Sequence, residues 1–464
     1  MSQNASALPF EEPRQSLLGR ATAFFVYLFE RVMPEPFVFA VLLTLVGAIL
    51  AFLFAPRASL PAIASAWYGG VFAIFAFAFQ MVIMLVAGYA LAVAPPVQRI
   101  LARIASLVST PLSAISLTIF VSMIASWINW GLGLVTAALL AREMAKRIPV
   151  DFGWLVAAAY TGFVISTEGL SGSIALSQAT HGSALNIVEK VTGHGLPLSQ
   201  TVFTRFNLVP CLLLLLIMPL VFRALQPAAR DTVFADPERL REGDRQTSAK
   251  VRENTLSSRL DNAWILNALL VAFGVFALVS EWRRTGFALD LNSVIVILLL
   301  GGLTLHMRPA AYILAVKHAA RISGSLILQY PLYGGLMGII TTTGLAGVLS
   351  KVFIRVSTAH TLPFFTYLTS MIITLFVPSG GGHWAVQGPF AIPAAQALHA
   401  SLPGTTMAVA MGESVANMLQ PFFALPILAI AGMSMKRMMG FMVVTFVVSA
   451  VIFGLALLIL VPGA

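Results

Sequence analysis

VPSGGGHWAVQGP, residues 377–389, interrupts an apolar region that is long enough to span a lipid bilayer. Three consecutive glycines do not suit a continuous helix, since each costs roughly 1 kcal/mol relative to alanine in a helix interior. Glycine instead permits close approach of another group to the backbone. Because a serine and a histidine flank the triplet, residues 379–383 are typical of a discontinuous membrane helix whose N–H groups face a ligand. A simple kink or interfacial loop is the alternative interpretation.

The whole chain has the composition of a membrane protein. Of its 464 residues, 58% are hydrophobic and only 10% are charged, and the mean hydropathy is +0.90. Soluble domains average about 25% charged residues. These values predict an all-α polytopic membrane protein, because a barrel would show short alternating segments. The net charge of +10 comes from Lys and Arg clusters between apolar segments, as in cytoplasmic loops, and does not indicate a nucleic-acid partner.

Basic clusters and polar stretches divide the chain into two transmembrane halves. Residues 1–35 are expected to form a cytoplasmic lead, 36–225 the first half, 226–260 a cytoplasmic linker and 261–464 the second half. About nine crossings are expected, at 36–55, 71–93, 152–176, 203–223, 262–280, 289–306, 322–343, 405–434 and 438–461. Two re-entrant hairpins are expected at 111–143 and 362–400, each after an amphipathic helix, at 97–108 and 345–356.

The two halves repeat the same order of elements, which predicts two inverted repeats. Each half has a crossing, an amphipathic helix, a hairpin with a glycine-rich tip and a broken crossing. A separation of 249 residues relates Gln80 to Gln329, Gly131 to Gly380 and Gly133 to Gly382. The first hairpin is expected to enter from the cytoplasm and the second from outside, so that their tips meet within the membrane. Paired interrupted segments of this kind indicate a transport site between the repeats.

Polar residues around the hairpin tips are the candidate substrate-binding residues. They are Asn129, Gly131, Ser171, Ser173, Ser379, Gly380, Gly381, Gly382, His383, Gln387 and Asn417. Taken singly, each polar side chain could equally bridge two helices, and His383 could be a structural histidine with satisfied hydrogen bonds. Gathered around two tips, they predict a polar cavity at membrane depth.

Glu168 and Glu413 lie deep in apolar segments, in the two corresponding broken crossings. A charge at the bilayer centre costs about 2.5–3.5 kcal/mol on insertion scales, so such residues tend to face a cavity. Burial favours the neutral form of a carboxyl group, which suits the exchange of a proton with a coupling gradient. Both residues are therefore candidates for coupling. For Glu413, a hydrogen-bonded helix brace is the alternative interpretation.

Several long motifs carry a resemblance to a known family. They cover residues 377–384, 387–390, 392–397, Glu413, Asn417, 420–422 and 424–426, and in the first half 128–131, 133–134, 141–143 and 171–173. In these stretches the sequence resembles the bacterial short-chain fatty acid transporters, the permeases associated with acetoacetate and butyrate use. The resemblance implies inverted repeats with hairpins, a homodimer and an elevator movement. Glu168 stands where relatives are expected to have glycine, so the resemblance favours Glu413 for coupling.

These observations predict a multi-pass secondary transporter of the bacterial inner membrane. We expect it to move small monocarboxylates such as acetoacetate or butyrate by symport with a proton or a sodium ion, among membrane lipids and with no cofactor or bound metal. Aromatic residues could form an apolar slot for the substrate chain, with Trp130, Trp384, Phe390 and Phe422 as the candidates. The alternatives are a transporter of dicarboxylates or other organic anions, and an uncoupled channel. An enzyme is not expected, because the sequence has no HExxH, Walker A or GxSxG motif.

Overall fold

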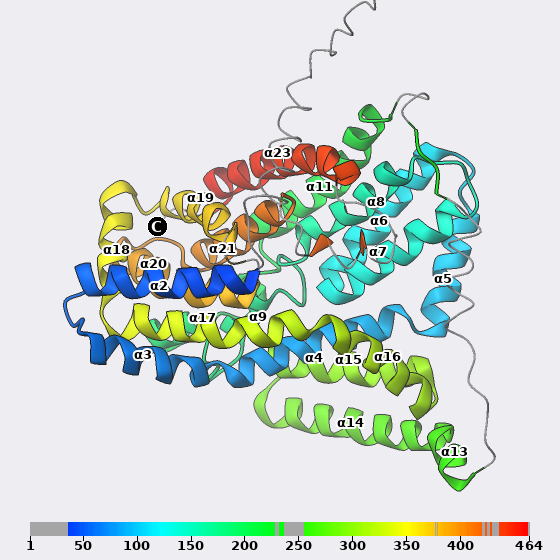
Figure 1. Ribbon diagram of the computed structural model, residues 1–464, viewed down its shortest axis with the longest axis horizontal. Helices are drawn as coiled ribbons and strands as arrows, with labels where there is room; N and C mark the ends of the chain where they lie inside the picture. The colour runs from blue at the N-terminus through cyan, green and yellow to red at the C-terminus, as the bar shows by residue number, and fades with distance from the viewer. Residues whose placement is uncertain are drawn as a thin grey trace, which may run out of the picture.

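A computed structural model of the chain describes residues 36–227, 232–235, 255–375, 377, 379–419, 423–424, 427–428 and 436–462. All regular secondary structure in these residues is helical, which confirms the all-α polytopic class (Figure 1). The predicted lead, 1–35, and most of the predicted linker, 226–260, lie outside the described residues. So do Pro378, 420–422 and 425–426 of the family motifs.

The helices follow the predicted order in both halves. Those of the first half are α2 (Pro36–Phe54), α3 (Leu60–Ala73), α4 (Phe75–Ala92), α5 (Pro95–Ser106), α6 (Pro111–Ile128), α7 (Trp130–Ala145), α8 (Phe152–Thr161), η2 (Gly162–Ile165), α9 (Ser173–Ala179), α10 (Ile187–Thr192), η3 (Leu198–Gln200) and α11 (Arg205–Ala224). Those of the second half are α13 (Leu256–Asp261), α14 (Trp264–Thr285), α15 (Leu291–His306), α16 (Pro309–Ile322), α17 (Gly324–Thr342), α18 (Leu345–Val356), α19 (Leu362–Thr374), α20 (Gly380–Ala397), α21 (Leu402–Asn417) and α23 (Lys436–Ile459).

The two amphipathic helices, α5 and α18, stand at opposite ends of the long axis of the molecule (Figure 1). Each packs against the second arm of its own hairpin, α5 against α7 and α18 against α20. The hairpin α6–α7 therefore lies toward one end and the hairpin α19–α20 toward the other. This arrangement is the one expected of inverted repeats whose hairpins approach each other from opposite sides.

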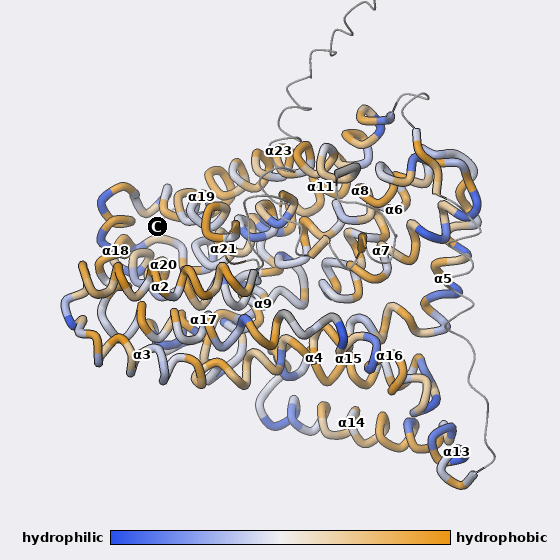
Figure 2. The backbone as a smooth tube through the Cα atoms, viewed as in Figure 1, coloured by the Kyte–Doolittle hydropathy of each residue, from blue (hydrophilic) through white to orange (hydrophobic). Residues whose placement is uncertain are grey.

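Long apolar helices form the outside of the molecule (Figure 2). On α14, for example, Leu269, Phe273 and Phe276 are each more than 60% exposed. Exposing such a surface to water would be unfavourable, at about 25 cal/mol per Å² of apolar area, whereas lipid tails solvate it. These helices therefore have the surface of a membrane-embedded protein.

The predicted count of nine crossings is not confirmed. Six described helical stretches are long and apolar enough to cross a bilayer, or seven if α17 and α18, which are bent by 75°, form one span. Several predicted crossings consist of shorter helices. The ten residues of α8 extend about 15 Å at 1.5 Å per residue, half of the roughly 30 Å hydrocarbon core.

Two longer helices, α3 and α16, and the short helices α10 and α13 are missing from the sequence prediction. The second crossing starts at Leu60 and not at residue 71, because α3 and α4 form one apolar stretch of 33 residues. Gly70 of α3 packs directly on the backbone of Gly334 and Gly338 in α17, so this part of the chain is held tightly against the second half. α16 occupies the predicted cytoplasmic connection, where Pro309 at its first turn favours a helix start.

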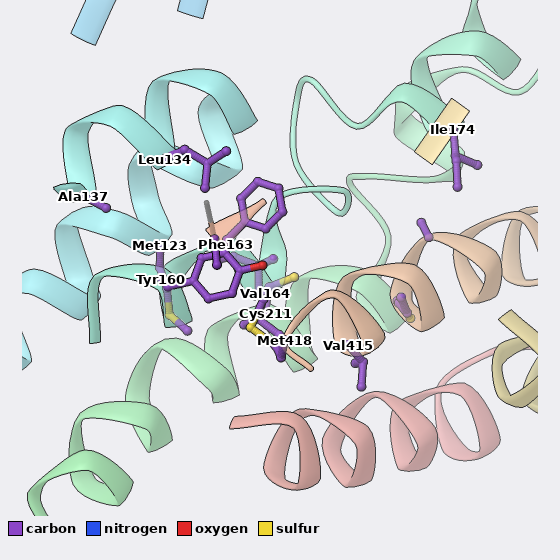
Figure 3. Close-up of a cluster of buried hydrophobic side chains, with 14 of the residues drawn as sticks. Met123, Leu134, Ala137, Tyr160, Phe163, Val164, Ile174, Cys211, Val415 and Met418 are labelled. Atoms are coloured by element: carbon purple, nitrogen blue, oxygen red, sulfur yellow. The ribbon is translucent and has the colours of Figure 1, made fainter. Parts of the chain in front are cut away.

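A buried apolar cluster positions the broken segments of both halves (Figure 3). It includes side chains from α6, α7, α8, η2, α9, α11 and α21, most of them gathered around Tyr160 and Phe163. The labelled members are Met123, Leu134, Ala137, Tyr160, Phe163, Val164, Ile174, Cys211, Val415 and Met418. The Tyr160 hydroxyl donates to the carbonyl of Asn417 at 2.9 Å, so α8 of one half is joined to the end of α21 of the other.

Candidate functional site

The tip of the first hairpin is fixed by hydrogen bonds on both sides of its break. Asn129 separates α6 from α7, and its Oδ1 accepts from the Leu132 N–H at 2.8 Å as an N-cap. The Trp130 N–H donates to Ser171 Oγ at 2.9 Å, which ties the tip to the broken segment after η2. Gly131 packs against the Leu85 carbonyl of α4. Asn129, Gly131 and Ser171 therefore shape the tip.

The tip of the second hairpin differs from the prediction in where the helix begins. Gly380, Gly381 and Gly382 form the first turn of α20, so the break precedes the triplet. A Cβ on Gly381 would overlap the Phe77 ring, and one on Gly382 would overlap the Tyr333 ring, so both glycines permit helix packing. Gly380 instead lies against Ser173 and Glu413, where a Cβ would come within 2.9 Å of Glu413 Oε2.

The two tips meet at one small cavity, as predicted. Its volume is about 30 Å³, room for about two water molecules. The lining residues come from both hairpin tips, both broken segments, α4 and α17: Met81, Trp130, Phe163, Ser166, Thr167, Gly172, Ser173, Leu326, Tyr330, Ser379, Gly380, Glu413 and Phe423. We call this the central cavity. Of the predicted site residues, it brings together Ser173, Ser379, Gly380 and Glu413.

Glu413 has one oxygen directed to the central cavity. Its side chain is 1% exposed, and its Oε1 accepts from Asn417 Nδ2 at 3.2 Å. Its Oε2 is buried and has no hydrogen-bond partner in the described part of the chain. A buried carboxylate oxygen without a partner is costly, so this atom is suited to a proton or a ligand that occupies the cavity.

Glu168 is equally buried, but a hydroxyl group lies within hydrogen-bond distance of each of its two carboxylate oxygens. Thr167 Oγ1 lies 3.1 Å from its Oε1 and 3.0 Å from the Ala410 carbonyl oxygen, and the one proton of this hydroxyl is shared among its contacts, whereas Ser414 Oγ donates to Oε2 at 3.0 Å. Thr167 and Ser414 also contact each other through their hydroxyl groups. Glu168 therefore joins the broken segment of the first half to α21 of the second half and does not line the central cavity.

His383 and Gln387 point into their own hairpin and away from the central cavity. The His383 ring lies 3.0 Å from Thr374 Oγ1 and 2.5 Å from Gln387 Oε1. Gln387 Nε2 donates to the Thr366 carbonyl at 2.9 Å. These contacts join α20 to α19, so the structural interpretation of His383 is the one that the geometry supports.

Aromatic side chains form one wall of the central cavity. The rings of Trp130 and Phe163 lie 6.1 Å and 5.0 Å from that of Phe423. The predicted slot residues Trp384 and Phe390 lie elsewhere: Trp384 Nε1 donates to the Leu185 carbonyl, and Phe390 packs on Phe353. Phe422 lies outside the described residues.

Sequence reasoning missed Met81 and Tyr330, although a signal for them was present. They are separated by 249 residues, the same spacing that relates Gln80 to Gln329. Both line the central cavity, one from α4 and the other from α17, and Ser379 Oγ donates to the Tyr330 hydroxyl at 3.2 Å. Extending the repeat by one position would have identified this pair.

Two hairpins that meet at a polar cavity between repeated halves are typical of one class of protein, the membrane transporters. A family model described as short chain fatty acid transporter matches residues 17–460. A protein of Escherichia coli K12, provisionally named a short-chain fatty acid transporter, is 38% identical over 442 residues, 95% of this chain and 99% of the relative. A protein of Haemophilus influenzae Rd with the same name is 35% identical over 441 residues, 94% and 98% of the two chains. The chain belongs to the short-chain fatty acid transporter family and is a multi-pass protein of the inner membrane.

Two solved transporter structures share the fold. The YdaH transporter of Alcanivorax borkumensis has a TM-score of 0.55 and 17% identity, over 91% of this chain and 98% of that one. MtrF of Neisseria gonorrhoeae, described with a class of antimetabolite efflux pumps, has a TM-score of 0.58 and 15% identity, over 95% and 98%. At such identities the similarity establishes the architecture and leaves the substrate of this chain open.

Proposed function

We propose that this protein moves a small monocarboxylate, such as acetoacetate or butyrate, across the inner membrane together with one proton. The observation that carries the proposal is the unpartnered Oε2 of Glu413 in the central cavity. The described residues that line this cavity include no Lys, Arg or His. A substrate carboxylate therefore has to be neutralised by something other than a basic side chain.

A proton shared between Glu413 and the substrate meets this requirement. Two ionised carboxylates 4 Å apart repel by about 4 kcal/mol at an effective dielectric constant of about 20. One proton on Glu413 Oε2 removes the repulsion and turns the contact into an O–H···O hydrogen bond to the substrate carboxylate. Substrate and proton then occupy the cavity together or not at all, which is the condition for symport.

The first turn of α20 supplies donors for the other side of the substrate carboxylate. Gly380 begins this helix at the cavity wall, where backbone N–H groups and the helix dipole favour an anion. The hydroxyl groups of Ser173 and Ser379 lie at the same wall. Trp130, Phe163 and Phe423 offer apolar surface for a short carbon chain.

The central cavity is smaller than a four-carbon acid in the described conformation. We infer that the hairpins separate from α4 and α17 when substrate enters, and close around it again before the opposite side opens. A dicarboxylate is the main alternative substrate. It would need a further cationic group, and the described lining of the central cavity contains none.

Uptake by purified protein in proteoliposomes tests the proposal. Labelled acetoacetate, butyrate and succinate are offered under an imposed pH gradient, acidic outside, and separately under a sodium gradient, with flux through protein-free vesicles subtracted. The expected result is uptake of both monocarboxylates, driven by the pH gradient, with little uptake of succinate. Uptake that responds to sodium and not to pH, or that prefers succinate, would contradict the proposal. Counterflow distinguishes a carrier from an uncoupled channel, because only a carrier exchanges label against a gradient.

A further inference from the structure

One polar atom of the central cavity, the hydroxyl oxygen of Ser166, has no role in the proposed function. Ser166 is fully buried and lines the cavity. Its Oγ has no hydrogen-bond partner in the described part of the chain. Among the described lining residues, the only other buried side-chain atom in this condition is Oε2 of Glu413. A buried hydroxyl without a partner is costly, so Ser166, like Glu413, is suited to a ligand that brings a partner with it.

The local backbone places Ser166 beside the aromatic wall of the central cavity. Ser166 directly follows η2, and its N–H donates to the Phe163 carbonyl at 3.0 Å. Side chains three residues apart in a 3-10 helix project from the same side. Phe163 and Ser166 therefore both reach the cavity, and the Phe163 ring lies 5.0 Å from that of Phe423. The hydroxyl thus lies at the wall where the proposed function places the carbon chain of the substrate.

The substrate carboxylate already has partners in other segments. Under the proposed function, one of its oxygens bonds to Glu413 on α21 and the other to the first turn of α20 at Gly380. The carboxylate therefore does not need Ser166. A polar group on the carbon chain of the substrate is the partner that remains for this hydroxyl.

Two other hydroxyl groups at the cavity already have contacts within the protein. Thr167 Oγ1 lies 3.0 Å from the Ala410 carbonyl oxygen, and Ser379 Oγ donates to the Tyr330 hydroxyl at 3.2 Å. Because such contacts compete with a substrate, these groups are weaker candidates than Ser166 for recognition of the carbon chain.

A hydroxyl at this wall can distinguish acids of equal length. Serine donates one hydrogen bond. Acetoacetate has an oxygen on carbon 3, separated from the carboxylate carbon by one methylene group, and this oxygen can accept the bond. Butyrate has the same number of carbons and no oxygen at that position. When a substrate displaces water from the cavity, acetoacetate gives the Ser166 hydroxyl a new partner and butyrate does not.

We propose that Ser166 determines the substrate preference of the central cavity. The preferred substrate is a small monocarboxylate with an oxygen on carbon 3, a 3-oxo or 3-hydroxy acid, over the saturated acid of the same length. The Ser166 hydroxyl donates to that oxygen while the carboxylate lies between Glu413 and α20. This inference rests on the proposed function, since it uses the same cavity and the same position of the carboxylate.

The variant Ser166→Ala tests the inference, with Ser126→Ala as its matched control. Ser126 is also a buried serine whose Oγ has no partner in the described residues, but it lies on α6 and does not line the central cavity. Exchange of labelled acetoacetate, 3-hydroxybutyrate and butyrate is measured in proteoliposomes without a gradient, at varied concentration, with flux through protein-free vesicles subtracted. The quantity compared is the half-saturating concentration of butyrate divided by that of each oxygen-bearing acid.

In the wild type, this ratio is expected to be about 10 for both oxygen-bearing acids. Ser166→Ala should lower it to about 1, because acetoacetate loses its hydrogen bond and butyrate no longer buries an unpartnered hydroxyl. Ser126→Ala should keep the wild-type ratio. The ratio compares two acids in one preparation, so a lower yield of active protein does not change it.

Ser166→Cys is a second variant for the case in which the alanine variant does not fold. A thiol is close to a hydroxyl in size and is only a weak donor, so this ratio should fall between those of Ser166→Ala and the wild type.

Three results would overturn the inference or its foundation. A ratio that neither Ser166 variant changes would rule out the role of Ser166 and leave the proposed function intact. An equal rise in half-saturating concentration for all three acids would also rule it out, and would assign Ser166 to the shape of the broken segment. A wild-type protein that exchanges no monocarboxylate would instead refute the proposed function itself.

Discussion

Glu168 and Glu413 occupy corresponding broken segments of the two halves, yet their surroundings differ. Both are buried, at 0% and 1% exposure. Each carboxylate oxygen of Glu168 lies within hydrogen-bond distance of a hydroxyl group, that of Thr167 or that of Ser414. Glu413 accepts one bond, from Asn417, and its second oxygen is directed to the central cavity. Glutamates in corresponding segments of a repeat can thus serve different purposes, and the number of oxygens with a hydrogen-bonding neighbour distinguishes them.

This difference assigns Glu168 a structural role and Glu413 a role in the transport site. The bonds of Glu168 connect the two halves and are complete without any ligand, so a change there should affect stability first. The open oxygen of Glu413 has a partner only when the cavity is occupied or the carboxyl group is protonated. A change there should affect transport first.

The largest expected effect comes from filling the space beside Glu413. Gly380→Leu would place a side chain against Ser173 and Glu413 and occupy a cavity of about 30 Å³. We expect uptake to fall by at least about 100-fold, because the substrate can then neither occupy the cavity nor approach the backbone closely. Size-exclusion chromatography of the detergent-solubilised variant checks that it remains folded.

Gly301→Ala is the control for Gly380→Leu. Its Cβ would lie 3.5 Å from Leu91 Cδ2, an ordinary contact, and alanine favours the helix. Its uptake should match that of the wild type. If Gly380→Leu also transports normally, Oε2 of Glu413 does not face the substrate site. The proposed difference in role between Glu168 and Glu413 would then be wrong.

At Glu168, the expected effect is smaller and falls on stability, with little change in uptake. Glu168→Gln weakens two buried hydroxyl bonds and should lower the free energy of unfolding by about 1–3 kcal/mol. Glu413→Gln should lower it less, because only the Asn417 bond is affected. Thermal unfolding in detergent compares the two variants, and uptake by Glu168→Gln should stay within about threefold of wild type. A stable Glu168→Gln protein with no uptake would show that Glu168 takes part in transport.

The sequence predicts the order of elements well, because hydrophobic length, basic flanks and interruptions are local signals. Both hairpins, both amphipathic helices and the tip at Asn129 occur where expected. The start of the second crossing is predicted too late, since no polar residue marks the contact of α3 and α4 at Ile74. The predicted number of crossings is not confirmed, because several predicted crossings consist of shorter helices. Pairing of the tips also follows from the sequence, because the 249-residue spacing is visible in it.

The direction of individual side chains could not be predicted from the sequence. His383 lies beside the glycine triplet, yet its ring turns to Thr374 and Gln387 of the same hairpin. Gly381 and Gly382 face aromatic rings of α4 and α17, which are distant in the sequence. Two buried glutamates look alike in a sequence until their hydrogen-bond partners are known. The homodimer, the elevator movement and the sodium alternative stay predictions.

The most direct test of the central claim, that Glu413 carries the coupling proton and Glu168 does not, compares Glu413→Gln with Glu168→Gln in proteoliposomes. Acetoacetate exchange without a gradient and net uptake driven by a pH gradient are measured in the same vesicles, and diffusion of the neutral acid is subtracted with Gly380→Leu vesicles. Glutamine mimics a permanently protonated Glu413. We predict that Glu413→Gln exchanges substrate but loses pH-driven uptake by at least about 10-fold, whereas Glu168→Gln retains both. A Glu413→Gln protein whose net uptake follows the pH gradient as in the wild type would contradict the account.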